Sequence, residues 1–174
     1  MFRIVYPDRN MASPSSQVFY YRGTNQPGSR NDAVNHPKAI YVHHSASAES
    51  TSVEEITRWH AARGFRTIGY HKVINLKGGV VVTHEGRRET EVGAHTQGHN
   101  TDSLGVCVAG NYSVNEMKAP VYEELLDVVG ALMRRYGIPA SQVFGHREAE
   151  GAASECPGLR FDLKKLRADL ALRA

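Results

Sequence analysis

The spacing of one cysteine and two histidines constrains the fold of this chain most strongly. His146 and Cys156 lie ten residues apart within residues 145–158, and His43 lies far upstream. For these three side chains to close on one metal ion, the fold must bring residue 43 beside residues 146 and 156. Neutral imidazole and thiolate are ligands that zinc accepts, and three protein ligands leave a fourth position for water, as in catalytic zinc sites. The three residues therefore favour a hydrolytic zinc centre.

The residues around Cys156 indicate a surface loop. The segment is rich in Gly, Ala and Ser, and Pro157-Gly158 follows as a turn signal, so the side chain can reach a shared ion. A single cysteine is more often a small buried hydrophobe, and that alternative remains open on local evidence alone. Residues 142–145 predict a short strand that ends at Gly145, which puts His146 at a strand end beside the loop.

Residues 39–45, Ala-Ile-Tyr-Val-His-His-Ser, predict a buried strand rich in β-branched and aromatic side chains. Successive side chains of a strand point to opposite faces, so His43 and His44 cannot readily serve the same site. His44 shares its face with Ile40 and Val42, which favours His44 as a packed histidine and His43 as a ligand. The alternative, in which both are hydrogen-bonded core histidines, is still open at this point.

The remaining sequence alternates strand and helix patterns. The expected elements are a helix from a capping box at Ser52 to Gly64, strands over about 70–76, 79–84 and 103–109, a helix over 120–136, and a last helix that begins at Asp162. Strands interleaved with helices predict an α/β fold, namely a single domain in which a central mixed β-sheet is flanked by helices.

Several short segments together resemble one protein family. In chain order they are Tyr41–Ser45, Ile68–His71, Gly93–Gly98, Asn100, Ser103–Val106, Gly110–Tyr112, Gly145–Arg147 and Ser154–Gly158. The ordered set, which covers roughly residues 38 to 160, resembles the zinc-dependent N-acetylmuramoyl-L-alanine amidases. Relatives of these enzymes include small bacteriophage lysins and the animal peptidoglycan recognition proteins. The resemblance implies the fold of that family for residues 38–174.

The resemblance also implies roles for individual residues. His43, His146 and Cys156 match the zinc ligands of the family, and Tyr70 matches a catalytic tyrosine beside the metal-bound water. Zinc lowers the pKa of bound water toward neutrality and polarises the scissile carbonyl. The phenol of Tyr70 would orient that water or donate a hydrogen bond to the developing oxyanion.

Ser154 departs from the pattern of the phage members. Many of them carry a lysine two residues before the cysteine, whereas the recognition proteins carry a threonine there. A hydroxyl can donate a hydrogen bond to an oxyanion, but a charge-assisted bond is roughly twice as strong. The resemblance therefore assigns Ser154 a catalytic role, and the departure bears on the rate of the reaction rather than on its identity.

His95, Thr96 and Asn100 match positions that line the cleft of the family, which implies that they bind the glycan or the stem peptide. As polar residues in a Gly-rich loop they could equally be solvated. His71 follows Tyr70 and should face away from it by strand alternation, so we expect it to pack or to support its neighbours.

The activity that the resemblance implies is hydrolysis of the amide bond between N-acetylmuramic acid and L-alanine in bacterial peptidoglycan, as in a bacteriophage endolysin that lyses its host. The alternative is a non-catalytic module that recognises peptidoglycan, as in relatives that lack the cysteine ligand. The complete set of His43, His146, Cys156 and Tyr70 favours the enzyme. Zincin-type protease chemistry is disfavoured because the chain contains no H-E-x-x-H motif.

Length and composition fit this interpretation. A chain of 174 residues has the size of one domain, and we expect a monomer. The chain contains neither a signal-peptide pattern nor an apolar run of membrane-spanning length, so we expect synthesis in the host cytoplasm and action on the cell wall. Cys107 lies mid-strand and should be buried; a disulfide with Cys156 would compete with zinc and is not expected.

The two ends of the chain are basic. Residues 1–38 and residues 159–174 each contain five basic and two acidic residues, whereas the whole chain has a formal net charge of +3. Basic ends could favour anionic envelope polymers or lipids, or merely complement a helix dipole. Nucleic acid is a poor candidate, because no dense basic run occurs. Residues 1–37, rich in Pro, Ser, Gly and Asn turns, are expected to form an extension strapped over the surface.

Overall fold

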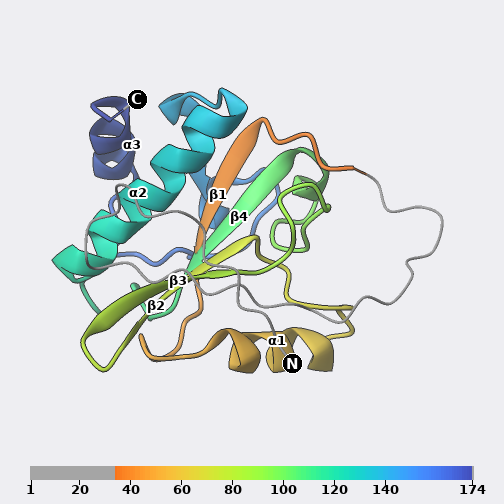
Figure 1. Ribbon diagram of the computed structural model, residues 1–174, viewed down its shortest axis with the longest axis vertical. Helices are drawn as coiled ribbons and strands as arrows, with labels where there is room; N and C mark the ends of the chain where they lie inside the picture. The colour runs from red at the N-terminus through yellow and green to blue at the C-terminus, as the bar shows by residue number, and fades with distance from the viewer. Residues whose placement is uncertain (1–33, 174) are drawn as a thin grey trace, which may run out of the picture.

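Five strands form one mixed sheet in the order β3-β2-β4-β1-β5 in the computed structural model, which describes residues 34–173 (Figure 1). The strands are β1 (Ala39–His44), β2 (Lys72–Lys77), β3 (Val80–Glu85), β4 (Ser103–Val108) and β5 (Val143–Gly145). β1 pairs in parallel with both β4 and β5, and β2 pairs in parallel with β4. Only β3, at one edge, is antiparallel to its neighbour β2. The predicted mixed sheet is confirmed.

Three α-helices cover the sheet: α1 (Val53–Ala62), α2 (Ala119–Tyr136) and α3 (Leu163–Ala171). Their ends carry the predicted signals. Ser52 and Glu55 form the capping box of α1, and the Asp162 side chain accepts a hydrogen bond from the backbone N–H of Lys165. α2 ends at Gly137, which has a φ of 65°, a left-handed conformation that glycine adopts without steric cost. Short 3₁₀ helices occur at η1 (Asn100–Asp102), η2 (Ala140–Gln142) and η3 (His146–Glu148).

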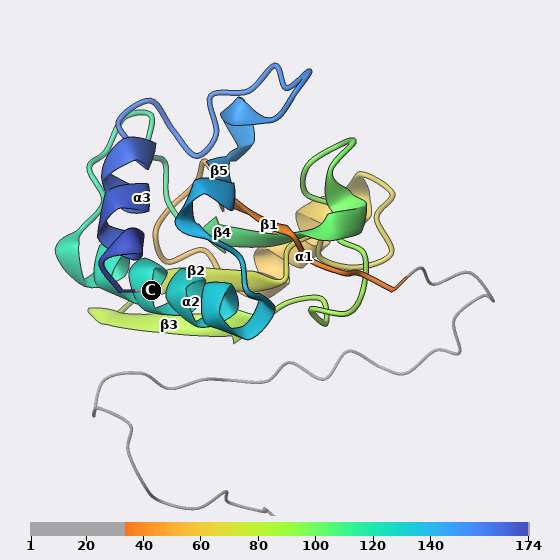
Figure 2. The ribbon, with the colours of Figure 1, turned by 90° about the horizontal axis from the view of Figure 1, so that it is seen from above.

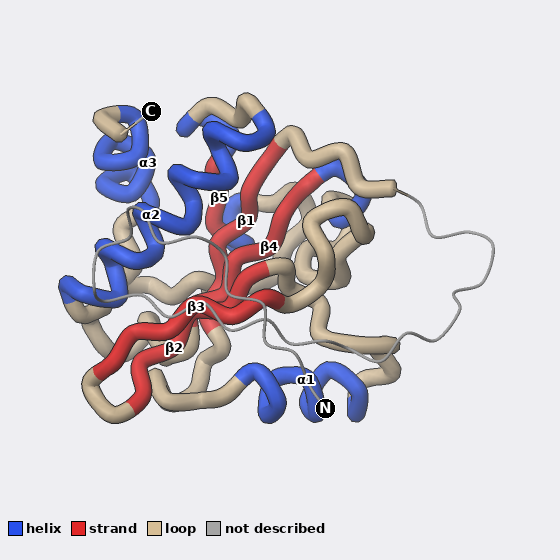
Figure 3. The backbone as a smooth tube through the Cα atoms, in the orientation of Figure 1, coloured by secondary structure: helices blue, strands red, loops and turns tan. Residues whose placement is uncertain are grey.

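The central strands β1 and β4 are buried on both faces, as is typical of parallel strands covered by helices. α2 and α3 pack on one face and α1 lies on the other, an arrangement visible in Figure 2 and Figure 3. Alternation along the strands divides the core accordingly. Ile74 and Val106 belong to the cluster beneath α2, whereas Val73 and Cys107 belong to the cluster beneath α1.

The start of β2 differs from the sequence prediction, and most of the predicted N-terminal extension is not described by the structure. Tyr70 lies just outside β2, since the strand begins at Lys72 rather than near residue 70. Of the predicted extension over residues 1–37, residues 1–33 lie outside the described part, and its boundary with the domain stays a prediction. Within the described part, Val34 forms a β-bridge with Glu91, and the Asn35 N–H donates to the Thr90 carbonyl over 2.9 Å.

Among residues 34–173, none of the helices combines the length and the apolar character that crossing a bilayer requires.

Candidate metal centre

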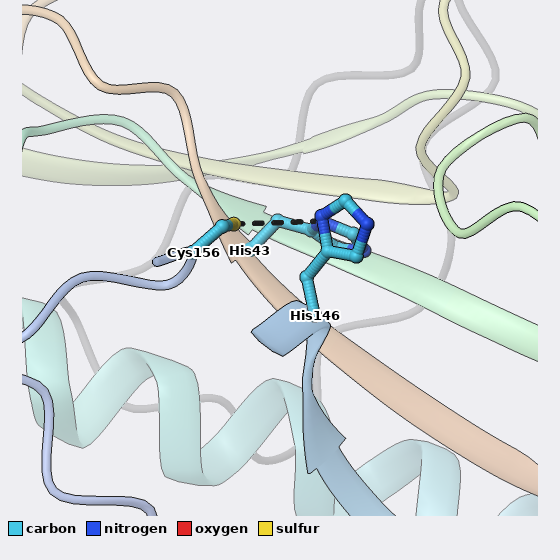
Figure 4. Close-up of side chains that lie close together, drawn as sticks. All are labelled: His43, His146 and Cys156. Atoms are coloured by element: carbon cyan, nitrogen blue, oxygen red, sulfur yellow. Dashed lines mark hydrogen bonds between the residues drawn. The ribbon is translucent and has the colours of Figure 1, made fainter. Parts of the chain in front are cut away.

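His43, His146 and Cys156 converge at one point beside the carboxyl ends of β1 and β5. One ligand atom from each lies within 4.8 Å of the others, and Figure 4 shows the three side chains turned toward one another. His43 Nδ1 and Cys156 Sγ are 3.7 Å apart. The zinc–nitrogen and zinc–sulfur bond lengths imply about 3.5 Å between these atoms in a tetrahedral site. The three residues therefore fit a zinc ion in their chemistry, and the spacing of His43 and Cys156 is close to that of a tetrahedral site.

Strand pairing explains why residues far apart in the sequence meet here. Val42 pairs with Gly145 in the parallel register of β1 and β5. His43 and His146 are the next residue after each of these, so they lie side by side at the ends of adjacent strands. Their ring centroids are 4.8 Å apart. His43 is only 1 % exposed. As predicted, His44 points elsewhere: its Nδ1 accepts a hydrogen bond of 3.1 Å from the backbone N–H of Tyr112.

The loop that carries Cys156 is held in place by its neighbours. The backbone N–H of Arg147 donates to the Cys156 carbonyl over 2.7 Å, and the Arg147 guanidinium donates to the carbonyls of Gly158 and Phe161. Ser154 is half-buried, and its Oγ accepts a hydrogen bond of 3.1 Å from the backbone N–H of Cys156. Arg147 thus links the segments of two candidate ligands, a role that no residue pattern indicated.

Burial sets the protonation states of the three candidate ligands. Burial and the neighbouring histidines hold the pKa of His43 well below its usual value, and burial lowers the pKa of His146. Both imidazoles are therefore neutral near pH 7, as a metal ligand must be. Burial raises the pKa of Cys156 to about 11, against the opposing effects of the His44 N–H and Arg147. A bound cation would reverse this shift and favour the thiolate.

Tyr70 lies against the same cluster, with its ring centroid 5.1 Å from that of His43. Burial raises the pKa of Tyr70 well above its usual value, so the phenol keeps its proton. The residue is held from two sides. Its carbonyl accepts a hydrogen bond from the Arg87 N–H over 2.9 Å, and its ring lies 5.1 Å from that of His60. The adjacent Gly69 N–H donates to His60 Nδ1 over 2.8 Å.

Sequence reasoning singled out neither His60 nor Arg87. The position of His60 carried a signal, because Val53, Ile56 and His60 recur at helical spacing and form the buried face of α1. No sequence pattern indicated Arg87. Its guanidinium donates to the main-chain carbonyls of Ile68 and Val92, and such carbonyls are present whatever the side chains are.

The structure places His95 and Thr96 beneath the His43 ring. Thr96 is 1 % exposed and His95 is 9 % exposed. His43 Nε2 lies 3.3 Å from both His95 Nδ1 and Thr96 Oγ1. Asn100, at the start of η1, accepts hydrogen bonds with its Oδ1 from the backbone N–H groups of both residues, over 2.8 and 2.9 Å. The substrate-binding role expected for these three residues stays a prediction.

Two further residues near the cluster, His71 and Cys107, are buried in the core. His71 is fully buried, with its Nδ1 accepting from the Gly105 N–H over 2.9 Å and its Nε2 lying 2.9 Å from the Glu91 carbonyl. Cys107 pairs with His43 across β1 and β4 and is buried. Both Cys107 and Cys156 are free thiols.

The sequence and the fold match known proteins. Residues 33–159 match the family model described as N-acetylmuramoyl-L-alanine amidase. The chain is 33 % identical over 136 residues to an endolysin of Enterobacteria phage T3, covering 74 % of this chain and 83 % of that protein. It is 40 % identical over 138 residues to an endolysin of Klebsiella phage KP32, covering 72 % of this chain and 82 % of that protein.

A solved structure shows the same architecture. The N-acetylmuramoyl-L-alanine amidase LysC from Clostridium intestinale URNW superposes with a TM-score of 0.76 at 27 % sequence identity. The match covers 88 % of this chain and 97 % of that one.

Proposed function

The chain belongs to the N-acetylmuramoyl-L-alanine amidase family, and we propose that it cleaves the amide bond between N-acetylmuramic acid and L-alanine in peptidoglycan with the help of a zinc ion. The observation that carries the zinc proposal is the convergence of His43, His146 and Cys156 within 4.8 Å. The phage endolysins among its relatives support a role in degrading the bacterial cell wall during host lysis.

Each residue of the site has a part in this proposal. His43, His146 and Cys156 would hold the zinc ion. When bound, zinc lowers the pKa of a coordinated water and polarises the scissile carbonyl. Tyr70 keeps its phenolic proton and lies against His43, so it can donate a hydrogen bond to the oxygen on which negative charge develops. Ser154, with its oxygen bonded to the Cys156 N–H, retains a hydroxyl proton that it can donate in the same way.

A non-catalytic recognition module is the second candidate, since peptidoglycan-recognition protein SC2 of Drosophila melanogaster is also a relative. The amidase is favoured because all three candidate ligands are present and close together, with Tyr70 beside them. A binding module needs neither a thiol nor a phenol at this point.

The decisive experiment is digestion of purified peptidoglycan by the full chain, with and without a chelator, followed by mass analysis of the released fragments. We expect free stem peptides that begin at L-alanine, their loss on chelation and their return when zinc is added. Tight binding to peptidoglycan without release of any peptide would establish the recognition module instead. Release that persists after complete metal removal would contradict the zinc proposal but leave the amidase intact.

A further inference from the structure

The two ring nitrogens of His43 face different partners. Nδ1 lies 3.7 Å from Cys156 Sγ and is the nitrogen on the side of the candidate metal site. Nε2 lies 3.3 Å from His95 Nδ1 and 3.3 Å from Thr96 Oγ1, with both partners buried. We propose that His95 and Thr96 are positioning residues that hold His43 by Nε2 and thereby direct the lone pair of Nδ1 toward the metal. This inference rests on the proposed zinc site.

The protons in this group can be assigned from the geometry. A histidine that binds a metal through Nδ1 carries its proton on Nε2, which must donate a hydrogen bond. The two atoms within reach of His43 Nε2 therefore act as acceptors. Thr96 Oγ1 is also 3.0 Å from His95 Nδ1, so the hydroxyl can accept from His43 and donate to His95, and the two donors then share the single lone pair of His95 Nδ1. His95 Nδ1 then has no proton of its own, and the proton of His95 lies on Nε2.

His95 Nε2 is buried and has no hydrogen-bond partner within residues 34–173. The ring is thus oriented by the contacts of its Nδ1 side rather than by a bond at Nε2. That orientation is the one in which His95 can accept from His43, which is how an outer residue fixes the tautomer of a metal ligand.

The surroundings hold His95 and Thr96 in this arrangement. Asn100 Oδ1 accepts from both of their backbone N–H groups, which fixes the backbone beneath His43. The His95 ring fits between two glycines. A Cβ added at Gly93 would lie 2.5 Å from His95 Cδ2, and one added at Gly105 would lie 2.5 Å from His95 Cγ. Such contacts are too short for any side chain, so both positions must lack one for the ring to sit beside His43.

The two possible roles of Thr96, support of His43 and substrate binding, predict different effects when its side-chain contact is lost. Thr96 is 1 % exposed, which leaves almost no surface for a substrate to touch. Loss of a substrate contact would raise KM and leave zinc binding unchanged. Loss of support for His43 would weaken zinc binding in the absence of any substrate.

The test is the zinc affinity of the full chain, measured by competition with a chromophoric chelator. We expect Thr96→Val, which keeps the shape but loses the hydroxyl, to weaken zinc binding by about 10-fold to 100-fold. Thr96→Ser, which restores a hydroxyl, should recover most of that loss. Thr83→Val is the matched control, because Thr83 is also buried and donates to Glu124 far from the site, and it should leave zinc affinity unchanged. A folded Thr96→Val chain with unaltered zinc affinity would overturn the proposal.

The tautomer offers a second test that needs no variant. Long-range ¹H–¹⁵N NMR of the zinc-loaded chain should show His95 protonated at Nε2 and His43 protonated at Nε2. A His95 proton on Nδ1 would contradict the assignment. Failure of the proposed function remains distinguishable, because a chain that binds zinc in the expected way but releases no stem peptide would refute the amidase and leave this inference standing.

Discussion

Zinc retention should depend on the Cys156 thiol. Two neutral imidazoles and one thiolate make up the candidate donor set, and a serine hydroxyl is a much poorer zinc ligand than a thiolate. We expect Cys156→Ser to lose zinc on dialysis and to lose lytic activity, measured as metal content and as clearing of cell walls. Cys107→Ala is the matched control, because the second free cysteine is buried within β4 and is not one of the three candidate ligands, and it should keep its zinc. A Cys156→Ser chain that lyses walls at the original rate would refute the ligand assignment.

The Tyr70 phenol should affect the rate without affecting the metal. Its hydroxyl can stabilise developing charge on the scissile carbonyl oxygen, and loss of such a donor costs about 10²–10³-fold in kcat. We expect Tyr70→Phe to retain wild-type zinc content while kcat falls by about that factor. Tyr136→Phe removes a phenol that donates to Glu89 in another part of the molecule and should keep the full rate. A Tyr70→Phe chain with unchanged kcat would exclude the phenol from catalysis.

At this scale the sequence predicted which three side chains converge but not what supports them. Strand alternation separated His43 from His44 correctly, since only the side of the strand had to be known. The contact between His43 and His95 joins a strand to a loop 52 residues away, and no local pattern encodes it. The sequence did not indicate that His95 and Thr96 are buried either. Both lie in a Gly-rich loop, and the glycines that suggest an exposed loop instead make room for an imidazole.

Among the elements, the hairpin β2–β3 and the segment after it are joined to α2 by a partly buried charge network. Lys72 Nζ lies 2.6 Å from a Glu85 carboxylate oxygen and 2.7 Å from one of Glu89. Glu89 also accepts hydrogen bonds from Arg135 and Tyr136 of α2. Burial alone would raise the pKa of Glu89, but the bonds from Lys72, Arg135 and Tyr136 lower it to about 2.

This shift makes stability depend on pH at the acidic end. The folded-state pKa of Glu89 lies below the unfolded value of about 4.3, so its contribution is present above that value and is lost as pH falls toward 2. We expect Glu89→Gln to lower the free energy of unfolding at pH 7 by about 1 kcal/mol, after allowance for solvent screening, and to cost little near pH 2. Urea denaturation at both pH values measures this. Glu150→Gln, at an exposed position, is the control, and equal losses at both pH values for Glu89→Gln would contradict the mechanism.

The elements themselves were predictable where periodicity and caps agree. The stripe over residues 121–133 and the capping box at Ser52 located α2 and α1 to within two residues. The start of β2 was placed too early, because Tyr70 looks like a strand residue by composition. In the structure its backbone is bound by Arg87 of a loop instead of by a neighbouring strand, and that contact is tertiary.

For the whole molecule, the basic carboxyl-terminal segment is largely neutralised within the fold. Four of its basic residues form ion pairs, with these partners: Arg160 with Glu116, Lys165 with Asp169, Arg167 with Glu148, and Arg173 with Glu123 and Asp127. Such pairing reduces the charge available to an anionic surface. Attraction of this segment to envelope polymers stays a prediction. In the structure these basic side chains pair with acidic side chains of the same chain.

The candidate zinc ligands come from β1, η3 and the loop before α3, so a bound ion joins segments that are more than a hundred residues apart in the sequence. The unfolded chain does not hold these donors together, and zinc should therefore bind the native state selectively. Free zinc at a thousand times its dissociation constant stabilises a native state by about 4 kcal/mol, which for a chain of this size corresponds to a Tm shift of roughly 8 to 16 °C.

We therefore expect Tm, measured by scanning calorimetry, to fall by about this amount when a chelator removes zinc and to recover as zinc is added back. The recovery should saturate with zinc concentration, because a single site is filled. Cys156→Ser lacks one of the three donors and should show no zinc-dependent shift, which separates specific binding from general effects of the metal on the protein surface. Equal Tm values for the wild-type chain in chelator and in zinc would mean that the three side chains, although close together, do not bind the ion tightly enough to join the segments that carry them.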